Sequence, residues 1–207
     1  MNEELVKLMG TIRANFIFIH KILDNQKLNF NDDYKKINYA YYNVFCAHYE
    51  SFFILIYNNN FSSAILLLRT MLELYVKSYY LEFIEKEKNT NILQLIDGEE
   101  DFPSFFKMLK DLESYKDKSG AKFEGVFIQF SKSELASYEK FSLFSHGKGE
   151  YLRTIFENNK ISYSNKQISD VVKTAKGLFE TLSLLLMYTH SLNDEVKEVI
   201  KELQEAL

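Results

Sequence analysis

The amino-acid sequence predicts an all-α protein, a single domain over residues 1–207 that folds as an up-and-down bundle of long helices. Turn-forming residues are scarce: one proline and seven glycines in 207 residues are too few for the many short strands of a sandwich or barrel. Apolar residues recur at spacings of three and four along most of the chain, which is the period of a helix that buries one face. A hydrophobic share of 46% is enough for one sizeable core.

The first three helices follow from this period and from the residues that interrupt it. One apolar stripe continues over about six turns of the first helix, formed by Leu5, Met9, Ile12, Phe16, Ile19 and Leu23. The sequence NFNDD supplies caps for a second helix at 34–57, which ends in the turn of Asn58, Asn59 and Asn60. A third helix is expected from Phe61 to about Lys88.

The rest of the chain is less uniform. Short helices are expected at 91–96 and at 103–115, where Pro103 suits a first helical turn. Ser133 is expected to cap a helix that ends at Gly147, and residues 150–164 are the one candidate for a small hairpin.

Two further helices complete the expected bundle. A long helix at 166–191 precedes a last helix, capped by Asn193 or Asp194, that docks on its own chain or on a partner. The apolar residues of this last helix are Val196, Ile200, Leu203 and Leu207. The expected core of the bundle includes Phe16, Leu68, Leu72, Phe144 and Leu182.

Charge and cysteine content exclude several classes of protein. A net charge of −4 argues against a broad surface that coats nucleic acid, although a local basic cleft could still bind RNA. The single Cys46 excludes an internal disulfide framework and a cysteine-cluster zinc site. The amino end carries acidic residues in place of a signal peptide, and no apolar run approaches the ~20 residues that span a bilayer. We therefore expect a soluble cytoplasmic protein that does not enter a membrane.

The segment AILLLRTMLELYV, residues 64–76, contains the first candidate site. Its only polar residues are Arg69, Thr70 and Glu73. Arg69 and Glu73 are four residues apart, so on a helix they lie one turn from each other on the same face. In such an apolar segment we expect the pair to be desolvated, which costs several kcal/mol per charge. A pair retained at that cost indicates a function.

The segment YEKFSLFSHGKG, residues 138–149, contains the second candidate site. It places Ser145 and His146 at the end of an aromatic-rich helix, beside a glycine loop that holds Lys148. A histidine there bonds the last helix carbonyls or acts on a ligand. If Arg69 and Glu73 face it, the three side chains suffice for phosphodiester cleavage without a metal: a guanidinium for phosphate charge, an imidazole as general acid or base, and a carboxylate to orient either one.

These two segments resemble the HEPN-like helical families of bacteria. The resemblance rests on NNFSSAILLLRTMLELYVKSYYLEF and on the later YEKFSLFSHG. It implies a bundle of four or five long helices, usually dimeric, and many members of these families are metal-independent ribonucleases in phage defence, toxin–antitoxin pairs or CRISPR immunity. The positions carried over are Arg69, Glu73, Ser145 and His146.

The sequence departs from the ribonuclease pattern at one place. In the active families an arginine is separated from the catalytic histidine by four to six residues, and at the corresponding positions before His146 this chain has Phe141, Lys140 and Glu139. Lys140 lacks the planar fork that grips a phosphate at two points, so Arg69 would have to supply that charge from another helix. Arg13 and His20 satisfy the spacing at the wrong end of the chain and form a second candidate pair.

Two functions of different classes remain. The first is a dimeric, metal-independent endoribonuclease that acts on RNA, with His146, Arg69 and Glu73 as catalytic residues and Ser145, Lys148 and Lys140 as substrate contacts. The second is a non-catalytic HEPN-like module that binds an operon-encoded partner protein or a small anionic ligand. No metal is expected, because the four histidines form no H-x-x-x-H or H-E-x-x-H motif. No cofactor is expected either, because glycine-rich phosphate loops and dinucleotide fingerprints do not occur.

Overall fold

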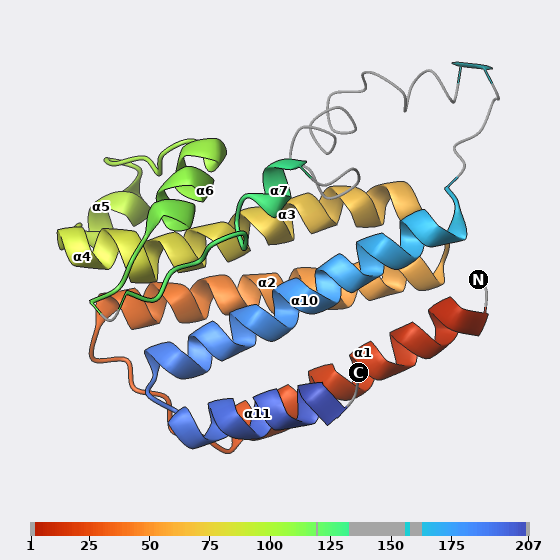
Figure 1. Cartoon of the computed structure of the whole chain (residues 1–207), viewed down its shortest axis with the longest axis horizontal. Helices are drawn as coiled ribbons and strands as arrows, with labels where there is room; N and C mark the ends of the chain where they lie inside the picture. Colours follow the sequence, from red (N-terminus) through yellow and green to blue (C-terminus); the bar gives the residue numbers. More distant parts are fainter. Residues whose placement is uncertain (1–2, 119, 133–155, 158–162, 206–207) are drawn as a thin grey trace.

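The computed structural model describes residues 3–118, 120–132, 156–157 and 163–205, and this part of the chain is helical (Figure 1). Five long helices dominate it: α1 (Glu3–Asp24), α2 (Asp33–Tyr57), α3 (Phe61–Tyr80), α10 (Asn165–Thr189) and α11 (Asn193–Glu205). Shorter elements are the π-helix η1 (Leu81–Glu85), α4 (Lys86–Lys88), α5 (Ile92–Asp97), α6 (Phe105–Ser114) and α7 (Gln129–Lys132). The extended backbone described here pairs at one isolated bridge, Lys116 with Lys122. The all-α prediction is confirmed.

The long helices are stacked in layers (Figure 1). Helices α2 and α3 form an antiparallel hairpin, and α10 packs against both of them. Helices α1 and α11 contact each other and α10, so they form an outer layer below α10 in the view of Figure 1. On the opposite side, α6 packs on α3 and η1, and α5 packs on α2. The last helix therefore docks on its own chain.

Capping side chains set the helix starts. The Asp32 carboxylate accepts a hydrogen bond from the Tyr34 backbone N–H at 2.9 Å and begins α2, as the NFNDD sequence predicts. Ser164 and Gln167 form a reciprocal capping box at the start of α10. Ser104 caps α6, so this helix begins after Pro103 rather than with it. The third helix does extend to Lys88, although its course includes the π-helix η1 that the apolar period did not predict.

The core agrees with the apolar stripes. Leu68, Leu72 and Leu182 are buried, whereas Phe16 is half-buried and its ring lies 5.1 Å from the ring of Phe179. Phe144 lies outside the described residues. So do the helix expected from Ser133 to Gly147 and most of the segment 150–164, the hairpin candidate.

One detail of the expected pattern is wrong. The apolar face of α11 is centred on Val199, which is fully buried, while Ile200 is exposed. The reason is the orientation of this helix, whose inner face is set by its contacts with α1 and α10. A short helix, α7 (Gln129–Lys132), also occurs just before Ser133, in a stretch for which the sequence analysis named no element. Within the described residues, none of the helices has the length and apolarity that crossing a bilayer requires.

Candidate functional site

Arg69 and Glu73 form the ion pair that their spacing predicts. The Nε of Arg69 donates a hydrogen bond to Oε1 of Glu73 at 3.3 Å. Their side chains are 19% and 35% exposed, so the expectation of a desolvated pair is wrong. The physical reason is that the deeply buried side of α3 carries Leu68 and Leu72, while Leu66 and this pair lie toward the surface. A partly exposed pair contributes at most about 1 kcal/mol to stability, so burial no longer indicates a function for it.

A pocket of about 430 Å³ opens beside Glu73. Its volume is within the range of about 300–1,000 Å³ that is usual for small-molecule sites. Side chains of α2, α3, α5, α6 and the loop between α5 and α6 line it: Tyr41, Glu73, Lys77, Leu95, Glu100, Asp101, Phe102, Pro103, Phe105 and Met108. The residues before and after Glu73 along the chain do not predict this pocket, because its opposite wall comes from a loop more than twenty residues away.

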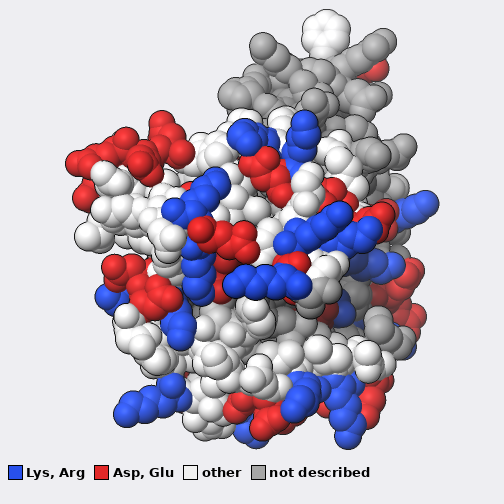
Figure 2. All heavy atoms as spheres, turned by 60° about the vertical axis from the view of Figure 1, so that its left-hand side comes forward, with Lys and Arg blue, Asp and Glu red and all other residues white. Residues whose placement is uncertain are grey.

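The charges of this pocket are mainly negative. Three carboxylates, those of Glu73, Glu100 and Asp101, line it together with one ammonium, that of Lys77. The Nζ of Lys77 lies 5.1 Å from the centre of the Phe102 ring, a cation–π contact that joins the α5–α6 loop to α3. A phosphate group would meet net repulsion here, whereas a cationic group would be attracted. Figure 2 shows acidic and basic side chains intermixed on this end of the molecule, without one continuous basic surface.

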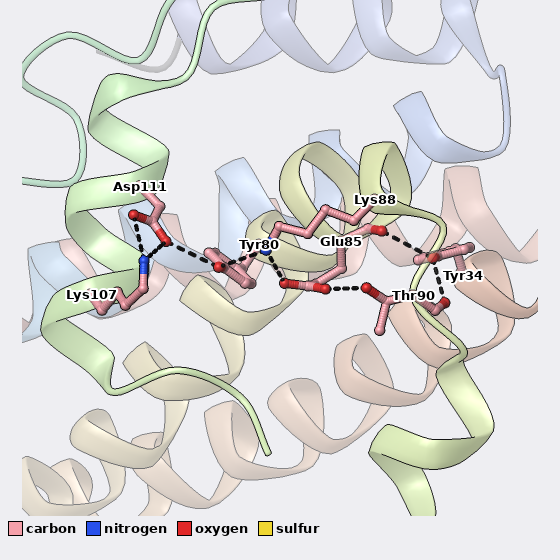
Figure 3. Close-up of polar contacts among 7 residues, drawn as sticks. All are labelled: Tyr34, Tyr80, Glu85, Lys88, Thr90, Lys107 and Asp111. Carbon is pink, nitrogen blue, oxygen red and sulfur yellow. Dashed lines mark hydrogen bonds and ion pairs between the residues drawn. The ribbon is translucent and has the colours of Figure 1, made fainter. Parts of the chain in front are cut away.

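A chain of polar contacts joins the helices that carry the pocket residues (Figure 3). On α6, Lys107 contacts Asp111 at 2.8 Å, and Asp111 accepts a hydrogen bond from the Tyr80 hydroxyl at 3.1 Å. Lys88 donates to the same hydroxyl at 3.4 Å and to Glu85 at 2.7 Å. Burial opposes the charge of Lys88, but the Glu85 carboxylate raises its pKa above the ordinary value.

The same contacts continue to α2 (Figure 3). Thr90 donates its hydroxyl proton to the Glu85 carboxylate. The Tyr34 hydroxyl lies within hydrogen-bond distance of the carbonyl oxygens of Thr90, at 2.6 Å, and of Glu85, at 3.1 Å. Thr90 and Asp111 therefore hold the two ends of the segment that supplies pocket residues 95–108. The sequence analysis missed this network, whose members come from four helices, the π-helix η1 and the loop that holds Thr90.

A second polar cluster lies inside the bundle. Asn15 of α1 donates to the Glu180 carboxylate of α10 at 2.6 Å, and Lys176 contacts the same carboxylate at 2.9 Å. Asn15 and Glu180 are both buried. The Tyr49 hydroxyl is also buried and has no hydrogen-bond partner among the described residues; burial, with the nearby Glu180 charge, raises its pKa well above the ordinary value. In the sequence, the i, i+4 spacing of Lys176 and Glu180 was the one available sign of this cluster. It did not stand out, because α10 carries many more apolar residues than charged ones.

Of the second candidate pair, His20 lines an open hollow of about 570 Å³ on α1, and Arg13 is not among the residues that line it. Arg13 is exposed. The Nδ1 of His20 is 3.0 Å from the carbonyl oxygen of Phe16, and its ring stacks on Phe179 at 5.9 Å between centres. These contacts account for His20 as a side chain that packs α1 against α10.

The remaining predicted site residues, Ser145, His146, Lys148 and Lys140, lie outside the described residues. The structure therefore brings together Arg69 and Glu73 and says nothing of their position relative to the histidine. Among the residues that it does describe, no three carboxylate, imidazole or thiol side chains are arranged to hold a metal ion.

Comparison with known protein families shows which family the chain belongs to. The model of a family of unknown function, DUF6988, matches residues 42–207. No curated protein and no solved structure matches the chain.

Proposed function

Since the chain belongs to the DUF6988 family, whose function is unknown, we propose a function from its own residues: it is a HEPN-like helical binding module that recognises a basic segment of a partner protein. The pocket beside Glu73 is the observation that supports this proposal. It combines apolar side chains such as Leu95 and Met108 with the carboxylates of Glu73, Glu100 and Asp101. The ligand it fits differs in charge from the anionic ligand that the sequence suggested.

A lysine or arginine side chain has the two properties that this pocket selects. Its hydrocarbon stem packs on apolar walls while its charged head remains near polar groups. An arginine head can also bind one carboxylate through two hydrogen bonds. Tyr41 supplies a protonated hydroxyl at the pocket wall, and burial raises its pKa still further above neutral pH.

Methyl resonances of Met108 provide the test. We expect acetyl-Arg-Leu-amide to shift the Met108 signal of ¹³C-methyl-methionine protein, and acetyl-Glu-Leu-amide to leave it unchanged. Met9 and Met71 are buried in the core and serve as internal references. Equal shifts with both peptides, or no shift with either at the limit of peptide solubility, would show that the pocket does not select a cation.

Variants of the acidic loop make this test specific. Glu100→Gln combined with Asp101→Asn is expected to lower the affinity for the arginine peptide by about 3- to 10-fold at low salt, because each exposed ion pair contributes ~0.2–1 kcal/mol. The matched control is Glu198→Gln combined with Glu202→Gln, which removes the same charge from exposed positions of α11. An equal loss of affinity in the control would mean that only net charge attracts the peptide.

A second candidate function is the metal-independent endoribonuclease, which the position of Glu73 favours because its carboxylate orients the guanidinium of Arg69 on a partly exposed face. In this proposal His146 is the general acid or base, Arg69 stabilises phosphate charge, and Ser145, Lys140 and Lys148 contact RNA. Such an enzyme would act in the cytoplasm, in phage defence or a toxin–antitoxin pair.

The ribonuclease proposal predicts RNA cleavage in excess chelator, with products that carry 2′,3′-cyclic phosphate ends. His146→Ala and Arg69→Ala should each abolish cleavage while circular dichroism still reports a folded helical protein. His20→Ala is the control for the pair at the start of the chain. If the wild-type protein cuts none of a diverse set of RNAs, alone or with the products of neighbouring genes, the catalytic proposal is wrong.

A further inference from the structure

Three aromatic side chains line the pocket beside Glu73, and each comes from a different part of the fold. Tyr41 belongs to α2, Phe102 to the loop between α5 and α6, and Phe105 to α6. Tyr41 and Phe102 are half-buried, and Phe105 is buried. Clusters of aromatic rings are what proteins use to bind quaternary ammonium groups, because the face of each ring attracts a cation. The rings therefore add a selectivity that carboxylates alone do not give.

One of these rings already holds a cation that belongs to the chain itself. The Nζ of Lys77 lies 5.1 Å from the centre of the Phe102 ring, within the ~6 Å over which the ring attracts an ammonium group. Lys77 and Phe102 both line the pocket. A cation of a ligand that approaches the same ring therefore competes with the ammonium of Lys77.

Hydration decides which ligand wins this competition. The ammonium of lysine is compact and strongly hydrated, and it has three N–H donors for water. When Lys77 turns into solvent its ammonium recovers that hydration, but an incoming unmodified lysine loses the same amount, so the exchange brings no net gain. A trimethylammonium group has the same charge and no N–H donors. It therefore gives up less hydration on entry, and the exchange is favourable.

We propose that the pocket selects an N-methylated ammonium group over an unmodified one, and that its ligand is a trimethyllysine side chain of the partner protein. This preference rests on the proposed function, since it names which cation of a basic segment the pocket binds. The trimethylammonium head packs on the three aromatic rings, while the carboxylates of Glu100 and Asp101 supply negative potential. Lys77 leaves the Phe102 ring when this ligand binds.

Three peptides that differ at one side chain test the selectivity. They are acetyl-Lys-Leu-amide, its trimethyllysine counterpart, and a neutral isostere of the latter in which carbon replaces the methylated nitrogen. Titrations of the full chain are followed at the Met108 methyl resonance, because Met108 lines the pocket. The trimethyllysine peptide should bind about 3- to 10-fold more tightly than either of the others. Equal affinity for lysine and trimethyllysine would overturn the proposal, and so would an isostere that binds as tightly as the cation.

Two phenylalanine variants locate the preference in the pocket. Phe102→Leu keeps an apolar side chain but removes the ring, so it should abolish the preference for trimethyllysine over lysine. Phe156→Leu is the matched control, because Phe156 is 89% exposed and does not line the pocket; this variant should retain the full preference. An unchanged preference in Phe102→Leu protein would contradict the proposed role of the ring.

A lysine variant tests the competition. Lys77→Gln should raise the affinity for the trimethyllysine peptide by about 3-fold or more, because it removes the competing ammonium. Lys110→Gln removes the same charge from an exposed position of α6 outside the pocket lining and should have a smaller effect. Equal effects of the two variants would show that Lys77 acts only through net charge, and the competition on the ring would be wrong.

Failure of this preference can be told apart from failure of the proposed function. If the arginine peptide shifts the Met108 signal while lysine and trimethyllysine peptides bind alike, the pocket selects cations and only the preference for methylation is wrong. If none of the cationic peptides shifts that signal, the pocket does not bind a basic segment at all.

Discussion

Glu180→Ala is the substitution that should damage the bundle most clearly without touching its apolar core. Glu180 accepts hydrogen bonds from Asn15 and Lys176 and is 8% exposed. Breaking a buried ion pair by removing one partner costs ~3–5 kcal/mol, and an amide left without an acceptor costs ~1–3 kcal/mol. The Lys176 side chain is 19% exposed and can turn toward solvent, which reduces the cost of breaking the ion pair. We therefore expect a loss of about 3 kcal/mol in the free energy of unfolding.

Thermal unfolding followed by circular dichroism measures this loss. In a protein of this size 1 kcal/mol corresponds to ~2–4 °C, so the melting temperature should fall by about 6–12 °C. Glu198→Ala, an exposed position on α11, is the control and should change stability by less than ~0.5 kcal/mol. If the Glu180 and Glu198 variants have the same melting temperature, Glu180 is not an essential partner of α1. Lys176→Met combined with Glu180→Leu should recover part of the loss, because apolar replacements of buried pairs are often tolerated.

Three further predictions concern the candidate site and the ends of the bundle. Glu73→Ala should reduce the free energy of unfolding by at most ~1 kcal/mol in urea denaturation, because its pair with Arg69 is partly exposed; a loss near 3 kcal/mol would indicate the desolvated pair first expected. Tyr80→Phe removes the hydroxyl between Lys88 and Asp111 and should cost ~1 kcal/mol, with faster amide hydrogen exchange in α6 than in α10. Burial lowers the pKa of His190, whose Nδ1 accepts a hydrogen bond from a backbone N–H. As the pH falls, His190 is therefore protonated in the unfolded chain before it is protonated in the folded protein. The stability that is present above pH ~6.5 is lost as the pH falls below that value. His190→Gln should therefore flatten the dependence of the urea midpoint on pH.

The long helices could be predicted because local rules determine them. The stripe from Leu5 to Leu23 and the cap at Asp32 each depend on residues within a few turns of one helix. Scarcity of proline and glycine then leaves few ways to interrupt a helix. The same reasoning fails at η1, because an extra residue in one turn changes which side chains face inward without leaving a mark in composition.

The candidate site could be predicted only in part. The spacing of Arg69 and Glu73 does predict their contact, but whether that contact is buried depends on how α3 is turned toward its neighbours. The pocket wall at Glu100 and Asp101 comes from the loop before α6, a helix that Asp111 joins to Tyr80 of α3. Contacts of that kind join distant parts of the chain, and no periodic pattern records them.

The place where the family match begins has a consequence for how members of this family can differ. It starts at residue 42, inside α2 (Asp33–Tyr57), and so leaves out α1 together with the capping residue Asp32. Yet Ile12 and Ile19 of α1 are fully buried against the bundle, and an isolated chain that began at residue 42 would expose the apolar side of α10 that they cover. The start of the matched region is thus not a boundary of folding. A relative that lacks this first helix must cover that side of α10 by other means, with a different helix of its own or with another polypeptide.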